Sequence, residues 1–190
     1  MITNGCCNKY HISSTLVILT SFLFVSFNGC FYQYFANHEL SKIKMIRENL
    51  STNLSGKASS WSEPVRYFDG YDNVHYIFHG AINNNQQVEI YLSKYLFLAN
   101  AKSNFVNQSK KAYAAYAFYY MKIVDDQIGD QYAYKTQASP GPDLVFRRNH
   151  YLIVIRFEEV PKNNEEFKQF LELAKEIAQL IDKHLKGKGQ

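Results

Sequence analysis

The stretch Leu144–Phe157, L-V-F-R-R-N-H-Y-L-I-V-I-R-F, decides the fold class. Two runs of β-branched and aromatic residues flank the turn Arg148-Asn149-His150, and Asn tolerates the positive φ that a tight turn needs. In the second run, one face carries Tyr151, Ile153 and Ile155, and the other carries Leu152 and Val154. A strand that is apolar on both faces belongs in the interior of a sheet. The stretch therefore predicts a hairpin whose second strand is internal.

Working outward, three further runs have the alternation and turn boundaries of strands, at 74–79, 88–92 and 132–136. The first two are joined by an Asn-rich turn and are expected to form a hairpin. Residues 105–121 include ten uncharged, alanine-rich residues and predict a largely buried helix. The fold class expected is α+β, a single domain at 61–186 with an antiparallel sheet of about five strands and two long helices packed on it.

The second long helix closes the domain. Asn163 or Asn164 can cap it, and Glu165 and Glu166 suit its positive end. Apolar residues recur at helical spacing at Phe167, Phe170, Leu171, Ala174, Ala178, Ile181 and Leu185. This stripe is expected to face the sheet, and residues 187–190 form a tail.

The sequence G-D-Q-Y-A-Y at 129–134, D-L-V-F-R-R-N-H-Y-L-I-V-I-R at 143–156 and the terminal helix resemble the closing third of several uncharacterised bacterial lipoprotein families. Where those families carry Gly-Asn in the turn, this chain has Asn149-His150. Some of them have a Mog1/PsbP-like fold, an antiparallel sheet with helices packed on it. The resemblance implies a fold and no activity.

The N-terminal stretch Leu16–Cys30 decides the compartment. Twelve uncharged residues, 16–27, follow Lys9 and lead to Gly29-Cys30, which is the anatomy of a secretory signal. The Gly29-Cys30 junction resembles the lipobox of bacterial lipoproteins, which implies lipid attachment at Cys30 and a signal peptide at 1–29. The alternative is an uncleaved signal anchor extending to about residue 35, with Phe31, Tyr32, Tyr34 and Phe35 as an interfacial aromatic belt.

Residues 30–60 are expected to be a tether, a short helix followed by a flexible linker, because apolar residues thin out there and end in S-T-N-L-S-G-K-A-S-S. All three cysteines, Cys6, Cys7 and Cys30, precede the domain, so it contains no disulfide and no cysteine chemistry. The formal charge of +4 is too small and scattered to indicate nucleic acid.

Several side-chain groups in the domain were weighed as sites. Tyr113, Tyr116 and Tyr120 form a helical stripe that either lines a ligand pocket or packs on the sheet. Arg147, Arg148 and His150, with Arg156 nearby, either contact an anionic lipid or a phosphate or form a solvated hairpin end. Asp125, Asp126 and Asp130 are read as solvated turn residues rather than an acid/base pair.

A metal site is not expected. His75 and His79 would share a zinc ion on a helix, but on a strand four residues span about 13 Å, which is too far. No cofactor motif is present either. The sequence indicates a non-enzymatic, membrane-anchored protein of the cell envelope, with its domain outside the cytoplasm, which binds an unknown protein or small molecule. The alternatives are a single-pass accessory subunit of a membrane complex and a hydrolase of envelope polymers.

Overall fold

The computed structural model describes residues 37–67, 72–83, 86–110, 121–124, 127–137 and 143–186. The chain divides into two compact units, Met1–His38 and Glu39–Gln190, and the fold below is that of the second. The expected signal or anchor segment, Cys30 and the tail at 187–190 lie outside the described residues. None of the described helices is long and apolar enough to cross a membrane.

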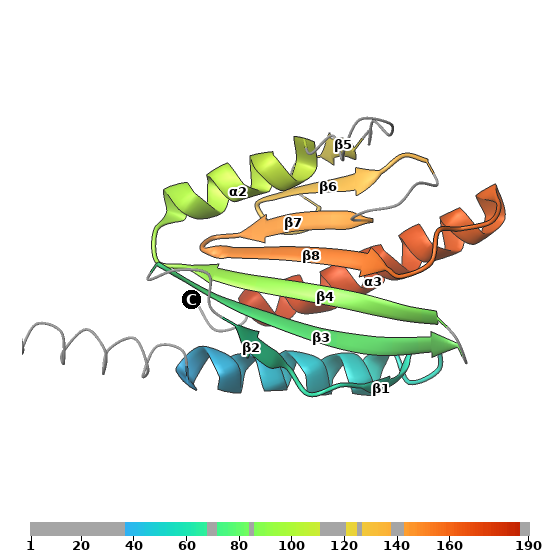
Figure 1. Ribbon diagram of the computed structural model, residues 1–190, viewed down its shortest axis with the longest axis horizontal. Coiled ribbons are helices and arrows are strands. Elements are labelled where there is room, and N and C mark those ends of the chain that lie inside the picture. The colour runs from blue at the N-terminus through green and yellow to red at the C-terminus, as the bar shows by residue number, and fades with distance from the viewer. Residues whose placement is uncertain are drawn as a thin grey trace, which may run out of the picture. The chain divides into compact units, whose positions relative to one another are not determined.

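The second unit is an α+β domain built on one antiparallel sheet, as expected (Figure 1). The described residues form eight strands: β1 (Ser59–Trp61), β2 (Val65–Tyr67), β3 (Asn73–Asn83), β4 (Gln86–Tyr95), β5 (Met121–Val124), β6 (Gln131–Lys135), β7 (Leu144–Arg148) and β8 (Tyr151–Phe157). Their order is β1-β3-β4-β8-β7-β6-β5, and β2 also pairs with β3. The helices are residues 37–53, here called the N-terminal helix, α2 (Leu98–Lys110) and α3 (Asn164–Lys186).

The five expected strands are all present. β3 and β4 form the expected hairpin, and β8 is internal because it pairs with both β4 and β7. Asn149 has φ 50° in the turn between β7 and β8, which is the positive φ predicted for an Asn in this turn. The three strands that the sequence did not predict, β1, β2 and β5, are three or four residues long, too short for alternation to stand out.

One face of the sheet, called the inner face, is buried over its central strands. Among its residues with no exposed surface are Tyr76, Phe78, Ile90, Leu92, Phe146, Ile153 and Ile155. The N-terminal helix and α3 cover this face, as the Tyr151–Glu39 hydrogen bond and the Phe157–Phe170 ring contact at 4.6 Å show. Most of the hydrophobic stabilisation of the domain therefore lies on this side of the sheet.

The opposite, outer face is covered only in part. Helix α2 packs Ala101 and Phe105 against Ala133, Val145 and Leu152. Beyond α2, the β2-β3-β4-β8 part of this face leaves Val65 and Arg156 exposed and other side chains half-buried, among them Ile77, Tyr91 and Val154. The described residues thus leave a half-open sheet surface.

The short helix expected in the segment 30–60 is present at 37–53, but the part of the segment from Glu39 on is not a tether outside the domain. It lies in the same compact unit as the sheet, and Ile43, Ile46, Leu50, Leu54 and Ala58 are all buried. The sparse apolar residues that suggested a loose helix are the single buried stripe of a helix that is polar on its other sides. The domain therefore begins near residue 39 rather than near Trp61.

The helix expected at 105–121 was also misplaced. Helix α2 begins at Leu98 and is described to Lys110, whereas Met121 begins strand β5. Residues 111–120 lie outside the described residues. The sequence did not predict the start of α2 because Leu98–Asn104 is mostly polar. From this stretch, only Ala101 belongs to the buried cluster that α2 forms with the sheet.

Candidate functional site

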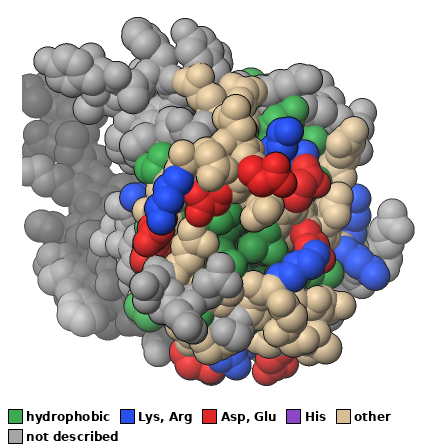
Figure 2. Space-filling model, turned by 90° about the vertical axis from the view of Figure 1, so that its right-hand side faces the viewer, with side chains coloured by type: hydrophobic (Ala, Val, Ile, Leu, Met, Phe, Trp, Pro, Cys, Tyr) green, Lys and Arg blue, Asp and Glu red, His purple; other side chains and the backbone are tan. Residues whose placement is uncertain are grey.

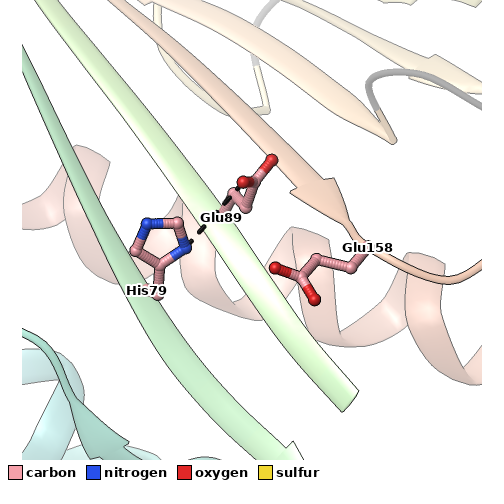
Figure 3. Close-up of side chains that lie close together, drawn as sticks. All are labelled: His79, Glu89 and Glu158. Atoms are coloured by element: carbon pink, nitrogen blue, oxygen red, sulfur yellow. Dashed lines mark ion pairs between the residues drawn. The ribbon is translucent and has the colours of Figure 1, made fainter. Parts of the chain in front are cut away.

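The half-open outer face carries a cluster of His79, Glu89 and Glu158 (Figure 3). His79 on β3 and Glu89 on β4 are cross-strand partners, so their side chains leave the same face. Glu158 follows β8 directly, and its N–H donates to the Gln87 carbonyl at 3.1 Å. The ligand atoms of the three side chains all lie within 4.8 Å of one another.

Glu89 is the centre of the local electrostatics. One of its oxygens lies 3.9 Å from His79 Nδ1, and the other accepts a 3.0 Å hydrogen bond from the Tyr91 hydroxyl. The Arg156 guanidinium is 3.9 Å away on the neighbouring strand. The surface thus offers a ligand an imidazole, carboxylates, a phenol and a guanidinium on a partly exposed face of the sheet.

A metal ion is one ligand that this cluster could hold. Two atoms bound to one zinc ion lie at most about 4.4 Å apart, because each bond is about 2.0–2.2 Å. The side chains would need small rotations to meet that limit, and a cation would compete with Arg156 for Glu89. The cluster is geometrically close to a one-imidazole, two-carboxylate site, but Glu89 is already partnered.

The two histidines weighed from the sequence lie on a strand, as expected. His75 is buried, with its Nδ1 2.6 Å from Ser93 Oγ, whereas His79 belongs to the cluster with Glu89. The sequence analysis missed the pairing of His79 with Glu89. The register of the expected hairpin could have revealed it, while nothing in the sequence signals that Glu158 joins them.

Arg147 and Arg148 both form ion pairs within the domain, and the anion contact expected at the hairpin end stays a prediction. Arg147 Nη1 lies 2.7 Å from Asp130, and Arg148 bonds both Asp130 at 2.7 Å and Asp182 at 2.6 and 2.9 Å. His150 Nδ1 lies 3.1 Å from the Tyr95 carbonyl oxygen. Asp130, expected to be a solvated turn residue, instead joins two strands, because it also accepts the Asn149 N–H at 2.7 Å.

A second cluster lies where the N-terminal helix meets β8. The Tyr151 hydroxyl donates to Glu39 at 2.6 Å and accepts from Lys42 at 2.9 Å, and the Lys94 ammonium lies 4.1 Å from the centre of the Tyr151 ring. Burial raises the pKa of Tyr151 far above its usual range, and the Glu39 carboxylate adds to this. Burial lowers the pKa of Lys94, the Glu39 carboxylate opposes this, and the Lys42 ammonium reinforces it.

The sequence analysis missed this second cluster because it placed Glu39 and Lys42 in a tether. Their position on a helix with the buried stripe Ile43, Ile46 and Leu50 was the available signal. The tyrosine stripe Tyr113, Tyr116 and Tyr120, the pair Asp125 and Asp126, and the expected lipid attachment residue Cys30 lie outside the described residues.

Comparisons with known proteins give no information on the site. No protein-family model, curated protein or solved structure matches this chain. The resemblance to bacterial lipoproteins and to the Mog1/PsbP-like fold therefore stays a prediction from the sequence.

Proposed function

We propose that this chain is a membrane-anchored protein of the cell envelope whose folded domain is a binding module. The observation that carries the binding role is the half-open outer face with His79, Glu89, Tyr91 and Arg156. Mixed polar and aromatic side chains on a partly exposed sheet face suit an extended ligand that has both hydrogen-bonding groups and apolar surface. Anchoring is supported by the uncharged stretch 16–27 and the Gly29-Cys30 junction.

Binding fits this face better than hydrolysis does. Glu89 accepts a hydrogen bond from Tyr91 and lies close to Arg156, so its charge is balanced by neighbouring groups. A catalytic carboxyl must lie within hydrogen-bond reach of the group that it serves, and both neighbours of Glu89 would compete with a substrate for it. The sequence also contains no hydrolase motif of the G-x-S-x-G or H-E-x-x-H type.

Mass spectrometry of the mature N-terminus tests the anchor. We expect a chain that begins at a lipid-modified Cys30, and loss of both lipid labelling and membrane retention in Cys30→Ala. An uncleaved N-terminus with unchanged membrane extraction in Cys30→Ala would instead establish a single-pass anchor.

Co-sedimentation of the full-length protein with purified peptidoglycan, in detergent, tests the binding face. We expect Tyr91→Ala and Arg156→Ala to lower retention. The matched control is Lys168→Ala, an exposed residue of α3, the helix that covers the opposite face of the sheet. Equal retention of all three variants would show that the outer face does not bind peptidoglycan. Cleavage of the peptidoglycan by the protein would instead favour the alternative function, a hydrolase of envelope polymers.

A further inference from the structure

The end of the sheet at which the chain joins the domain has a distinct surface. Glu39 begins the second compact unit and bonds Tyr151, the first residue of β8, which pairs with Lys94 near the end of β4. We call this the proximal end, marked by Glu39, Lys94 and Tyr151. Any anchor in the preceding segment is covalently connected to the domain here.

Three consecutive apolar side chains are exposed at the proximal end, in the connection between β4 and α2. Leu96, Phe97 and Leu98 have 44%, 57% and 39% of their surfaces exposed. Isolated exposed apolar residues are common, but adjacent large ones form a patch that usually has a partner. We call Leu96–Leu98 the apolar loop.

The backbone holds the apolar loop in this exposed position. The Leu96 N–H donates to the Asp72 carbonyl at 2.7 Å, and the Asn100 side chain bonds the Asp72 carboxylate. Tyr95 N–H donates to the His150 carbonyl at 2.9 Å. Because both flanks are hydrogen-bonded to residues that directly precede β3 and β8, the backbone keeps the three side chains at the surface.

The proximal end is rich in basic side chains. They come from the N-terminal helix, from β4, from the first turns of α2 and from the last turn of α3: Lys42, Lys94, Lys102, Lys183 and Lys186. Among the described residues, the acidic groups of this end are Glu39, which is engaged by Tyr151, Asp72, which is engaged by Asn100, and Asp130 and Asp182, which are engaged by arginines, with Lys186 also paired to Asp182. The described basic side chains of the proximal end outnumber these acidic ones, so this end carries net positive charge together with the exposed apolar loop.

The opposite end of the sheet has the reverse balance. Glutamates gather where β8 ends and α3 begins, namely Glu89, Glu158, Glu159, Glu165 and Glu166, with Arg156, Lys162 and Lys168 as the nearby bases. Figure 2 looks onto this end, where acidic side chains with some basic ones border a small apolar area. The domain is thus electrically polarised along the strands.

We propose that the apolar loop inserts into the interfacial region of the membrane that anchors the chain, with the lysines of the proximal end facing anionic headgroups. This inference rests on the anchoring part of the proposed function and deepens it by orienting the domain. Large apolar side chains partition into the headgroup and acyl-chain boundary, and nearby lysines are attracted to anionic lipid. The orientation directs the acidic end away from the bilayer.

Tryptophan quenching in reconstituted vesicles tests this orientation. Full-length Phe97→Trp is placed in vesicles of phosphatidylcholine and phosphatidylglycerol with brominated acyl chains, which quench indoles that enter the bilayer. Val160→Trp is the matched control, because Val160 is 44% exposed and follows β8 at the opposite end. The sole natural tryptophan, Trp61, is 7% exposed and gives the background emission.

We expect Phe97→Trp emission to be quenched several-fold more than that of Val160→Trp, and less so when phosphatidylglycerol is omitted. Equal quenching of the two variants in protein that floats with the vesicles would overturn the insertion and leave the anchoring intact. Shielding of Phe97→Trp from aqueous iodide without lipid quenching would show that the loop packs on protein, which also overturns it. Failure of the parent protein to float with vesicles would instead overturn the proposed anchoring.

Discussion

The Tyr151 hydroxyl donates a 2.6 Å hydrogen bond to the Glu39 carboxylate, although 112 positions separate the two residues in the chain. The bond joins the internal strand β8 to the first turns of the N-terminal helix, and both groups are buried. The bond thereby fixes the N-terminal helix, which the sequence pattern placed in a tether, to the start of the central strand β8.

Tyr151→Phe tests how much this bond stabilises the domain. We expect the free energy of unfolding to fall by about 1–3 kcal/mol, because a buried carboxylate loses its donor. The matched control is Tyr91→Phe, which removes a hydroxyl from a half-buried carboxylate on the outer face and should cost about 0.5 kcal/mol. Urea denaturation of the two variants measures the difference, and equal losses would contradict the structural role of Glu39.

The Arg148–Asp182 ion pair connects β7 to α3 and makes stability depend on pH. Burial alone would raise the pKa of Asp182, but hydrogen bonds from Arg148 and Lys186 outweigh this and lower it below its usual 3.8. A carboxyl whose pKa is lowered by folding contributes stability above its unfolded pKa and loses it as the pH falls through the folded value. We therefore expect the stability advantage of the parent over Asp182→Asn to shrink below about pH 4.

Arg148→Met tests the same pair at neutral pH. It leaves the buried Asp182 carboxylate with the Lys186 ammonium and the Gly129 backbone as its remaining partners, so we expect a loss of about 3 kcal/mol. The control is Lys57→Met, which breaks the exposed pair with Glu176 and should cost at most about 1 kcal/mol. Thermal melts of Arg148→Met and Lys57→Met at neutral pH compare the two ion pairs. Melts of the parent and of Asp182→Asn across pH test the pH dependence, and equal pH dependence of these two proteins would count against the Arg148–Asp182 pair.

Lys135 and Asp143 form a fully buried ion pair at 2.8 Å. Burial raises the pKa of Asp143, while the charge of Lys135 and its hydrogen bond oppose this. We expect Lys135→Met to lower the free energy of unfolding by about 3–5 kcal/mol, because it leaves the buried Asp143 charge without its ion-pair partner. The variant should lose further stability as the pH rises, because a carboxyl whose pKa is raised by folding favours the folded state only while it is protonated. Adding Asp143→Asn should restore about 1–3 kcal/mol, since it removes the unpaired charge and keeps an acceptor for the Phe157 N–H.

Helix α3 tests which stripe holds it to the sheet. Leu171, expected from the sequence to be buried, is only half-buried, whereas Leu173 and Ile177 were not predicted and are buried. We expect Ile177→Ala to cost about 2–5 kcal/mol and Leu171→Ala about 1 kcal/mol. Chemical denaturation of both variants measures the two losses. A larger loss in Leu171→Ala than in Ile177→Ala would mean that α3 contacts the sheet through the stripe that the sequence predicted.

His75 and His79 should not bind one metal ion together. We expect His75→Ala to leave the zinc titration of the full-length protein unchanged, because His75 lies beside Ser93 whereas His79 lies beside Glu89. Calorimetry measures this, with His79→Ala as the comparison. Stoichiometric zinc binding that is lost in both variants would be incompatible with the β3 strand.

The sequence by itself determined the elements whose pattern is repeated several times. The alternation of β3, β4 and β8, the Asn149 turn and the long terminal helix each repeat one period often enough to distinguish strand from helix. It could not reveal β1, β2 and β5, because three or four residues do not establish a period.

Only the tertiary structure decided which charged groups meet. Glu39 and Tyr151, Arg148 and Asp182, and Glu89 and Glu158 come from elements far apart in the chain. Sheet register and helix placement, which depend on packing of the whole inner face, bring them together. The same packing pairs Arg147 and Arg148 with carboxylates and places Leu96–Leu98 on the surface, because burial follows from the arrangement of all the elements and not from local hydrophobicity.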